Sequence, residues 1–539
     1  MPQVRFLPMK ALVQVPQGTR LTEAARLAGI GLSAPCGGRG SCGKCRVELD
    51  GRTVLACQTL VTRDMAVRVP EQALQILSDP GPLDAHLSPP VALRREGDQE
   101  AVVRNGQVLA LRRVGLPFLA AAADLGTTTL VLYLLDARTG ALLSTKSASN
   151  PQRSFGADVI SRVDYALRCG PERLTALLRE AVNQLLREAL AEAGAREEDL
   201  FSLSIAGNSC MHHLFLGVCP EGLAAAPYAL SVTGLLEESA ASLSLAMHPQ
   251  GRVFLLPCIA GFVGADTAAL LLRTDFDRLE SPTLAVDVGT NGELALGDAS
   301  GFTVCSAAAG PAFEGAGIAC GAPALTGAVA HASLRGGELS LQVLGGGTPC
   351  GICGSGLMDL LALLLDAGLM DATGRLLAPE ELTIPLARRL VRRLTTLRGE
   401  PIFVLFSEAE TGGEAVYLSQ GDIRALQLAK AALRAGIELL LADRALAAEE
   451  LSCVLLAGAF GSALDPRSAC RIGLLPPALA GRIRPIGNAA GAGAVQAILD
   501  QDALARIQNL AGAGRYLELA DAPEFQSRFF SAMDFPADA

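Results

Sequence analysis

Short hydrophobic runs separated by turn residues predict a small β-rich domain at the start of the chain. Runs of four or five residues with alternating or continuous apolar positions are typical of short strands. Thr19 or Thr22 can cap a helix that begins near residue 21, and Gly29 can end it. We therefore expect a β-grasp unit within residues 1–75, with strands at 4–7, 11–15, 46–49 and 65–69 around a helix at about 21–28.

The larger part of the chain contains one pattern twice. An apolar strand leads into Asp124-Leu-Gly-Thr-Thr-Thr129, followed by a second strand, a turn and a third strand. The segment Asp287-Val-Gly-Thr-Asn-Gly292 stands in the same context 163 residues later. A supersecondary unit that recurs in this way indicates an internal duplication. We expect an α/β body of two related halves, residues 118–282 and 283–539.

Residues 76–117 differ in character from both neighbours. They combine prolines with the charged run from Arg94 to Glu100, a composition typical of a connector. The Asn105-Gly106 pair lies between two β-prone runs and predicts a small hairpin. The sequence leaves open whether this segment is a mobile tether or a rigid docking element.

Charge and composition narrow the classes of partner. The chain has 539 residues, a formal net charge of -10 and no tryptophan, which argues against a nucleic-acid polymer as its main partner. Prolines interrupt the first residues, and every apolar run is shorter than the roughly 18 residues of a membrane-spanning helix. We expect a cytoplasmic protein that makes no use of a membrane.

Four of the 14 cysteines are clustered. Cys36, Cys42, Cys45 and Cys57 have the spacing C-x5-C-x2-C-x11-C, close to that of plant-type ferredoxins. The glycines between them allow backbone amides to approach the sulfurs. Tetrahedral zinc is the alternative, but zinc sites usually contain two paired C-x2–4-C elements, and Cys57 stands alone. We interpret the four as ligands of a 2Fe–2S cluster.

Each Asp-x-Gly-Thr segment can bind part of a nucleotide. A carboxylate at a strand end, Asp124 or Asp287, can position Mg²⁺ and water, while the turn that follows offers amides and hydroxyls to phosphate. Two such turns facing each other would hold a triphosphate. The candidate phosphate-binding residues are Gly126, Thr127, Thr128 and Thr129 in the first turn, and Gly289, Thr290, Asn291 and Gly292 in the second.

A third glycine turn completes the candidate site. An apolar strand ends at Gly458-Ala-Phe-Gly461, where bare backbone can border the adenine and ribose. Near Asn488 a helix begins whose N-terminus suits phosphate. The chain contains no P-loop motif, and no Gly-x-Gly-x-x-Gly follows a strand with dinucleotide-binding spacing.

These motifs resemble those of the acetate and sugar kinase, heat-shock chaperone and actin superfamily. Asp124–Thr129 and Asp287–Gly292 match its two phosphate motifs, and Leu456–Gly461 matches its adenosine motif. Asn208 falls at the strand-to-helix junction beside the γ-phosphate, so the resemblance implies a catalytic role for it. The implied fold is a β-grasp 2Fe–2S ferredoxin domain, a linker and duplicated RNase H-like, actin-type ATPase domains.

The order of cluster, linker and duplicated ATPase resembles the reductive activators of corrinoid proteins. This resemblance implies ATP-dependent transfer of single electrons to a Co(II) corrinoid protein of a methyltransferase system, with a low-potential electron donor upstream and a homodimer as a possible assembly. Three alternatives remain: an ATP-coupled donor to another low-potential acceptor, a small-molecule kinase, and a redox-sensing binding protein. His212, His213 and the Cys350-Gly-Ile-Cys353 segment are expected to be structural.

Overall fold

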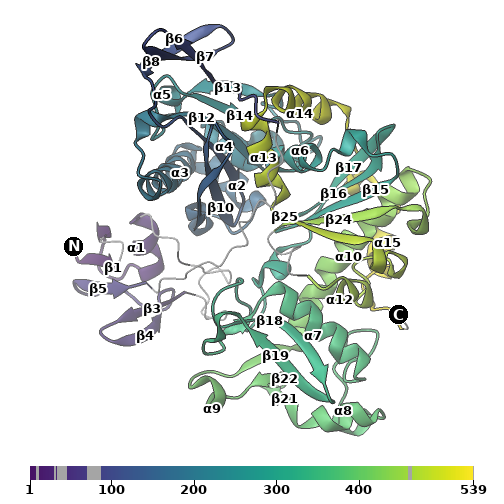
Figure 1. Cartoon of the computed structure of the whole chain (residues 1–539). Helices are drawn as coiled ribbons and strands as arrows, with labels where there is room; N and C mark the ends of the chain where they lie inside the picture. The colour runs from purple at the N-terminus through teal and green to yellow at the C-terminus, as the bar shows by residue number, and fades with distance from the viewer. Residues whose placement is uncertain (8–10, 29–31, 33–44, 70–85, 459–463, 538–539) are drawn as a thin grey trace.

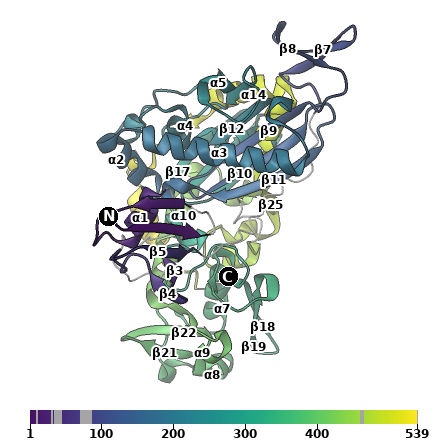
Figure 2. The ribbon, with the colours of Figure 1, turned by 90° about the vertical axis from the view of Figure 1, so that its left-hand side faces the viewer.

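The computed structural model describes residues 1–7, 11–28, 32, 45–69, 86–458 and 464–537. Figures 1 and 2 show a small N-terminal body beside two larger lobes. No helix among these described residues has the length and apolar character needed to cross a membrane.

The N-terminal body is the expected β-grasp unit. Its parallel central strands β1 and β5 are flanked by β2 on one side and by β3 and β4 on the other. Val4, Phe6, Val47 and Val67 are fully buried beneath helix α1, whose Leu21 completes this core. Strand β4 was not anticipated by the sequence pattern. The elements are β1 (Gln3–Leu7), β2 (Ala11–Gln14), α1 (Leu21–Leu27), β3 (Arg46–Leu49), β4 (Arg52–Leu55) and β5 (Met65–Arg68).

The connecting segment contains an antiparallel sheet of β6 (Ala92–Glu96), β7 (Gln99–Arg104) and β8 (Gln107–Arg113). Asn105 and Gly106 form the predicted hairpin turn, with φ of +49° and +79°, the left-handed geometry of a two-residue type I′ loop. Most of the charged run from Arg94 to Glu100 is therefore strand, with Gly97 and Asp98 in the turn between β6 and β7, where the composition indicated a connector. Ala101 and Val102 are buried, and Glu100, which is also buried, pairs with Arg138, while Arg94, Arg95 and Glu96 are more exposed.

This sheet is docked rather than free. Arg104 pairs with Glu237 of the first lobe at 2.9 Å, and the Ser88 amide donates to the Leu499 carbonyl at 2.9 Å. Val91 and Val102 also belong to the core of that lobe. Within residues 86–117, these contacts are of the kind expected of a docking element.

The first lobe is built on a sheet with strand order β11-β10-β9-β12-β14-β13. Strands β9, β10 and β11 form an antiparallel meander, and β12 and β14 add in parallel to β9. The strands are β9 (Leu119–Leu125), β10 (Thr129–Asp136), β11 (Leu142–Ser149), β12 (Leu200–Gly207), β13 (Leu236–Ser239) and β14 (Arg252–Leu255). The helices are α2 (Val159–Cys169), α3 (Glu172–Glu192), α4 (Ser209–Leu216), α5 (Ala240–Leu243) and α6 (Ala265–Arg273).

The sheet of the second lobe has the strand order β25-β24-β15-β16-β17-β26. Taken from the other edge, its strands β17-β16-β15-β24-β25 correspond to β11-β10-β9-β12-β14 of the first lobe. Strands β15, β16 and β17 form the meander, and β24 and β25 add in parallel to β15. The two sheets therefore match strand for strand over five positions, which confirms the duplication. The elements are β15 (Thr283–Val288), β16 (Gly292–Asp298), β17 (Gly301–Ala307), α10 (Gln420–Asp443), β24 (Cys453–Ala457), α12 (Pro466–Arg471), β25 (Ile483–Gly487), β26 (Arg515–Tyr516) and α15 (Phe525–Ser531).

Between β17 and α10 the second lobe carries an extra α/β segment, at the bottom of Figure 1. Helix α7 packs its apolar face into the lobe core, with Leu357 and Leu361 fully buried. The elements are β18 (Ala328–Arg335), β19 (Glu338–Val343), β20 (Gly351–Ile352), α7 (Gly354–Asp366), α8 (Pro385–Leu390), β21 (Leu394–Leu397), β22 (Glu400–Phe406), α9 (Glu408–Thr411) and β23 (Val416–Ser419).

Helices α13 (Ala489–Leu499) and α14 (Gln501–Ala513) return from the second half to the first lobe. Figure 1 shows the yellow α13 beside α6 and the first sheet. Gly493 makes this approach possible, because a Cβ at this position would lie 2.0 Å from the carbonyl oxygen of Ala269 in α6. The division of the fold at residue 282 thus separates the two sheets but not these two helices.

Replacing Gly493 by alanine is expected to lower the free energy of unfolding by about 1–3 kcal/mol, because backbone atoms cannot move aside as a flexible side chain can. Gly512 of α14 offers a matched control, since its Cβ would meet nothing within 4 Å. Gly512→Ala should be neutral or stabilise by up to about 1 kcal/mol through helix propensity. Urea midpoints of both variants test this, and equal midpoints would contradict it.

Candidate functional site

The first phosphate turn joins β9 to β10. The Gly126 amide donates to the Thr129 carbonyl at 2.9 Å, and a Cβ on Gly126 would lie 2.6 Å from that oxygen, so only glycine fits. Asn150, which directly follows β11, stabilises this turn through two hydrogen bonds. Its side-chain amide donates to the Gly126 carbonyl at 2.9 Å, and its backbone amide donates to the Thr128 carbonyl at 2.9 Å.

The second turn, between β15 and β16, faces the first. Its tight shape is closed by a 3.0 Å bond from the Gly289 amide to the Asn291 carbonyl. Gly292 packs on α10, where a Cβ would lie 1.9 Å from the Leu433 side chain. The hydroxyl oxygens of Thr128 and Thr290 are 3.3 Å apart. The structure therefore brings together the two turns that the sequence predicted would oppose each other.

Carboxylates gather beside these turns. Burial raises the pKa of Asp124 to about 7, against a 2.9 Å hydrogen bond from the Asn488 amide group that favours its charged form. Burial, together with the nearby charges of Asp266 and Asp124, raises the pKa of Asp287 to about 7. Burial likewise raises the pKa of Asp266 to about 6. A cation bound among these carboxylates would favour their ionised forms.

Two of these neighbours were not selected from the sequence. Asp266 lies in the first turn of α6, two residues after Gly264, and this position at a helix start after glycine was the available signal. Glu293 lies directly across from Asp287 in the β15–β16 ladder, and burial raises its pKa well above the usual range. A charged residue inside an apolar strand was the only hint of it.

Asn208 lies at the predicted strand-to-helix junction. It caps α4, accepting from the Met211 amide at 3.0 Å, and its own amide group donates to the Thr127 hydroxyl at 2.7 Å. Arg162 of α2, which the sequence did not single out, supports the same turn. Its side chain is fully buried and donates to the carbonyls of Thr127 and Gly156. Asn208 thus contacts the turn through a side chain that is itself fixed by helix capping.

Gly458 lies at the end of β24 with φ of +92°, a conformation that favours glycine. A Cβ there would stand 2.7 Å from a carboxylate oxygen of Asp287, so Gly458 adjoins the strand end that leads into the second phosphate turn. Gly461 lies outside the described residues. Asn488 caps α13 by accepting from the Gly491 amide at 2.8 Å while binding Asp124, which directs this helix N-terminus at the same site.

In the N-terminal body, Cys45 and Cys57 are buried and adjacent. The Cys57 amide donates to the Cys45 sulfur at 3.4 Å, and the Gln58 side chain donates to the Cys57 sulfur at 3.7 Å. Amide hydrogen bonds to sulfur stabilise thiolate, so this pair fits the ligands of an iron–sulfur cluster. Cys36 and Cys42 lie outside the described residues.

The remaining histidine and cysteine candidates are buried or bonded to backbone carbonyls. Burial lowers the pKa of His212 to about 4, and a ring nitrogen of His213 is 2.8 Å from the Ser209 carbonyl. The thiols of Cys350 and Cys353 donate to the carbonyls of Thr326 and Val329. None of these contacts involves a residue of the two phosphate turns.

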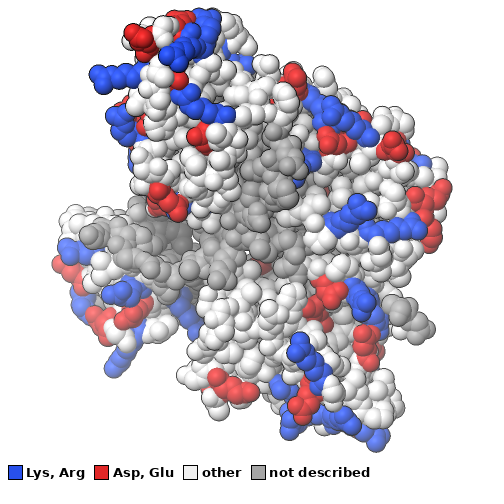
Figure 3. All heavy atoms as spheres, viewed as in Figure 1, with Lys and Arg blue, Asp and Glu red and all other residues white. Residues whose placement is uncertain are grey.

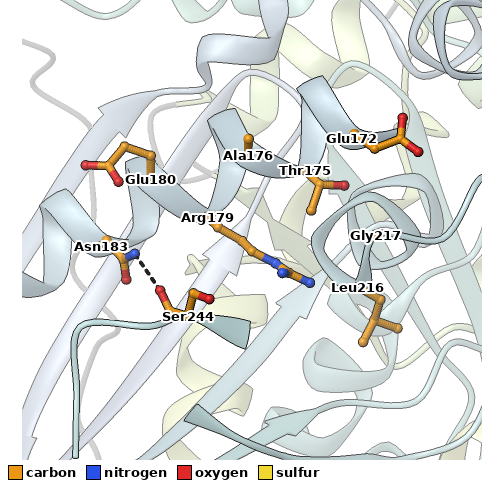
Figure 4. A pocket seen from close by; sticks show the side chains of 9 residues that line it. All are labelled: Glu172, Thr175, Ala176, Arg179, Glu180, Asn183, Leu216, Gly217 and Ser244. Carbon is orange, nitrogen blue, oxygen red and sulfur yellow. Dashed lines mark hydrogen bonds between the residues drawn. The ribbon is translucent and has the colours of Figure 1, made fainter. Parts of the chain in front are cut away.

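A separate pocket of about 470 Å³ lies on the first lobe, between α3, the end of α4 and Ser244 (Figure 4). Arg179 points into it, with its Nε donating to the Phe215 carbonyl at 2.8 Å, between Glu172 and Glu180. Figure 3 shows blue and red side chains interspersed on the face drawn there. This pocket shares no residue with the nucleotide turns.

Comparison with known proteins covers the whole architecture. Family models match residues 6–65 as a 2Fe–2S iron–sulfur cluster binding domain, residues 119–279 as the RACo middle region and residues 281–539 as the C-terminal ASKHA domain of RACo. The corrinoid activation enzyme RamQ of Eubacterium limosum is 31% identical, with 97% of each chain covered. A Co(II) methylated amine-specific corrinoid protein reductase of Methanosarcina barkeri is 25% identical over 71% of this chain and 70% of its own.

Among solved structures, a reductive activator for corrinoid, iron–sulfur protein superposes with a TM-score of 0.76 and 30% identity, covering 99% of this chain and 98% of its own. This agreement extends over the iron–sulfur domain, the connecting sheet and both lobes. The chain therefore belongs to the family of reductive activators of corrinoid proteins, in which a 2Fe–2S domain is joined to an ASKHA ATPase.

Proposed function

We propose that this chain uses ATP to drive single electrons onto a Co(II) corrinoid protein, restoring Co(I) for methyl transfer. The observation that carries the proposal is the meeting of two phosphate turns, through Thr128 and Thr290, in a chain that also holds a buried cysteine pair. A small-molecule kinase of similar fold does not need the buried cysteine pair.

Each group at the two phosphate turns has a separate task. Asp124 and Asp287 would hold Mg²⁺, and the Asn488 side chain orients Asp124 for this task. The turns at 126–129 and 289–292 bind phosphate oxygens through amides and hydroxyls. Gly458 leaves room for the nucleotide beside Asp287, and Asn208 fixes the Thr127 hydroxyl.

Cys45 and Cys57, with Cys36 and Cys42, would hold the 2Fe–2S cluster, which supplies one electron at a time. The chain's own amides and the core around Val47 exclude water from the described pair. Reducing a Co(II) corrinoid is uphill from ordinary ferredoxin donors, and for one electron about 59 mV corresponds to about 1.4 kcal/mol. ATP can meet that gap only through conformations that differ in affinity for the partner.

The two lobes provide such conformations. Nucleotide between the turns would draw the β9 and β15 ends together around the α6–α13 contact and change the surface offered to the corrinoid protein. We further propose a low-potential reductant as electron donor, a cytoplasmic location and a homodimer as the assembly.

The test is an anaerobic spectrum of a Co(II) corrinoid methyl-transfer protein mixed with the pre-reduced chain, with and without Mg-ATP. Co(I) formed only with ATP is the expected result. ATP hydrolysis without Co(I) for several such partners would overturn the assignment of the acceptor and favour another low-potential enzyme.

Binding of Mg-ATP is expected to release protons at pH 7. The pKa values of Asp124 and Asp287 are about 7 in the nucleotide-free chain, so each carboxyl is about half protonated, and a bound cation favours the ionised form. Apparent affinity should therefore rise from pH 6 to pH 8 and then level off.

Calorimetry in buffers of different ionisation enthalpy measures this release, which should be positive at pH 7 and near zero at pH 9. Proton uptake at pH 7 would contradict the assigned carboxylates.

A further inference from the structure

Glu314 occupies the junction between the two phosphate turns. It ends a short 3-10 helix, η5 (Pro311–Glu314), and is followed by Gly315 with φ of +68°. One of its carboxylate oxygens accepts from the Thr128 hydroxyl at 3.0 Å and from the Thr290 hydroxyl at 2.7 Å. A single carboxylate thus binds side chains from both lobes at the point where those lobes meet.

This arrangement cannot persist when phosphate is bound. Each threonine hydroxyl has one proton and can donate to either Glu314 or a phosphate oxygen, not to both. When the hydroxyls turn to phosphate, the carboxylate keeps its place between the turns and its oxygen becomes free to accept another proton. A water molecule beside the γ-phosphate would be such a donor.

A cationic side chain, Arg153, lies near Glu314. Burial lowers the pKa of Arg153, and the nearby Glu314 carboxylate opposes that shift. Arg153 also donates to the Ser149 hydroxyl at 3.2 Å, so its direction is fixed by a second contact. A phosphate group arriving between the turns would meet Arg153 as well as the threonines.

The other carboxylates near the two phosphate turns accept hydrogen bonds from other donors. Asp124 accepts from Asn488, Asp266 accepts from the Thr267 amide at 2.7 Å, and Glu293 accepts from the Ser306 hydroxyl at 3.4 Å. Among the hydrogen bonds of the described residues, only those to Glu314 join a carboxylate to the hydroxyls of both turns.

We propose that Glu314 is the general base of ATP hydrolysis, a role that rests on the ATPase activity proposed above. The oxygen of a water molecule bonds to the γ-phosphorus, the bond from that phosphorus to the bridging oxygen of ADP breaks, and ADP leaves with the electron pair. The water proton passes to the Glu314 carboxylate. Thr128 and Thr290, released from Glu314, donate to the transferred phosphoryl group.

The experiment compares the full-length chain with Glu314→Gln and Glu314→Ala, measuring ATP hydrolysis at saturating Mg-ATP and nucleotide affinity by titration with a fluorescent ATP analogue. Glu314→Gln should lower kcat by about 10²–10⁴-fold, the usual contribution of a general base. Its affinity for ATP should be unchanged or higher, because a negative charge near the phosphates is removed. Glu338→Gln, at an exposed position on β19, is the matched control and should keep wild-type kcat.

Added formate provides a readout that a purely structural role would not move. It should restore part of the kcat of Glu314→Ala, since the small carboxylate can enter the vacated space, but should not change the wild-type rate. A Glu314→Gln variant with kcat within about threefold of wild type, or one changed only in KM, would overturn the proposal and make Glu314 a latch between the lobes. If the wild-type chain itself binds no ATP, the proposed function fails and not this assignment alone.

Discussion

An Asp287→Asn variant is expected to slow ATP-dependent formation of Co(I) by about 10²–10³-fold or more. The reason is that the Asp287 carboxylate would hold Mg²⁺ beside the phosphates, where the ion offsets the negative charge that develops during hydrolysis. The side chain lies at the end of β15, next to Gly458 and near Asp124. An amide of the same shape keeps the packing but not the charge. Stopped-flow spectroscopy of Co(I) formation and a phosphate-release assay measure the loss.

The same substitution should leave the fold intact. Burial and nearby carboxylates raise the pKa of Asp287 to about 7, so at pH 8 its charge opposes folding in the nucleotide-free chain. Asparagine removes that penalty, and the thermal midpoint should be unchanged or higher. Asp98→Asn, at an exposed position, is the control for both readouts. Full ATP-dependent activity of Asp287→Asn would disprove the role given to this residue.

The second large effect is expected in the N-terminal body. Cys57→Ala should remove the 2Fe–2S cluster and with it all electron transfer to the corrinoid protein, while ATP hydrolysis by the two lobes continues. The reason is that Cys57 is a buried partner of Cys45, and three thiolates cannot complete the coordination of two irons. Iron and sulfide contents and the visible spectrum of the chain give the result.

Cys350→Ala is the matched control. Its thiol is exposed and donates to the Thr326 carbonyl, so it should retain the cluster and wild-type Co(I) formation. A Cys57→Ala protein that keeps full iron and sulfide content would contradict the assignment of the fourth ligand. Loss of the cluster in Cys350→Ala would contradict the structural role given to the Cys350-Gly-Ile-Cys353 segment.

The sequence by itself determined the features that depend on neighbouring residues. The Asn105-Gly106 turn needs two positive φ angles, and the first Asp-x-Gly-Thr turn needs a glycine because Gly126 has no room for a Cβ. Such requirements act over a few residues, so residue type and spacing reveal them. The duplication follows from the same logic, because two copies of a local pattern fold into two copies of a local structure.

Only the tertiary structure decided which distant residues complete the site. Asn488 reaches Asp124 across 364 positions, and Glu314 reaches Thr128 across 186. Gly493 shows its importance only against the Ala269 backbone of α6. These contacts arise when α13 returns to the first lobe and the two sheets bring their turns together. No pattern of neighbouring residues carries that information, because the free energy that selects it comes from burying apolar surface between segments far apart in the chain.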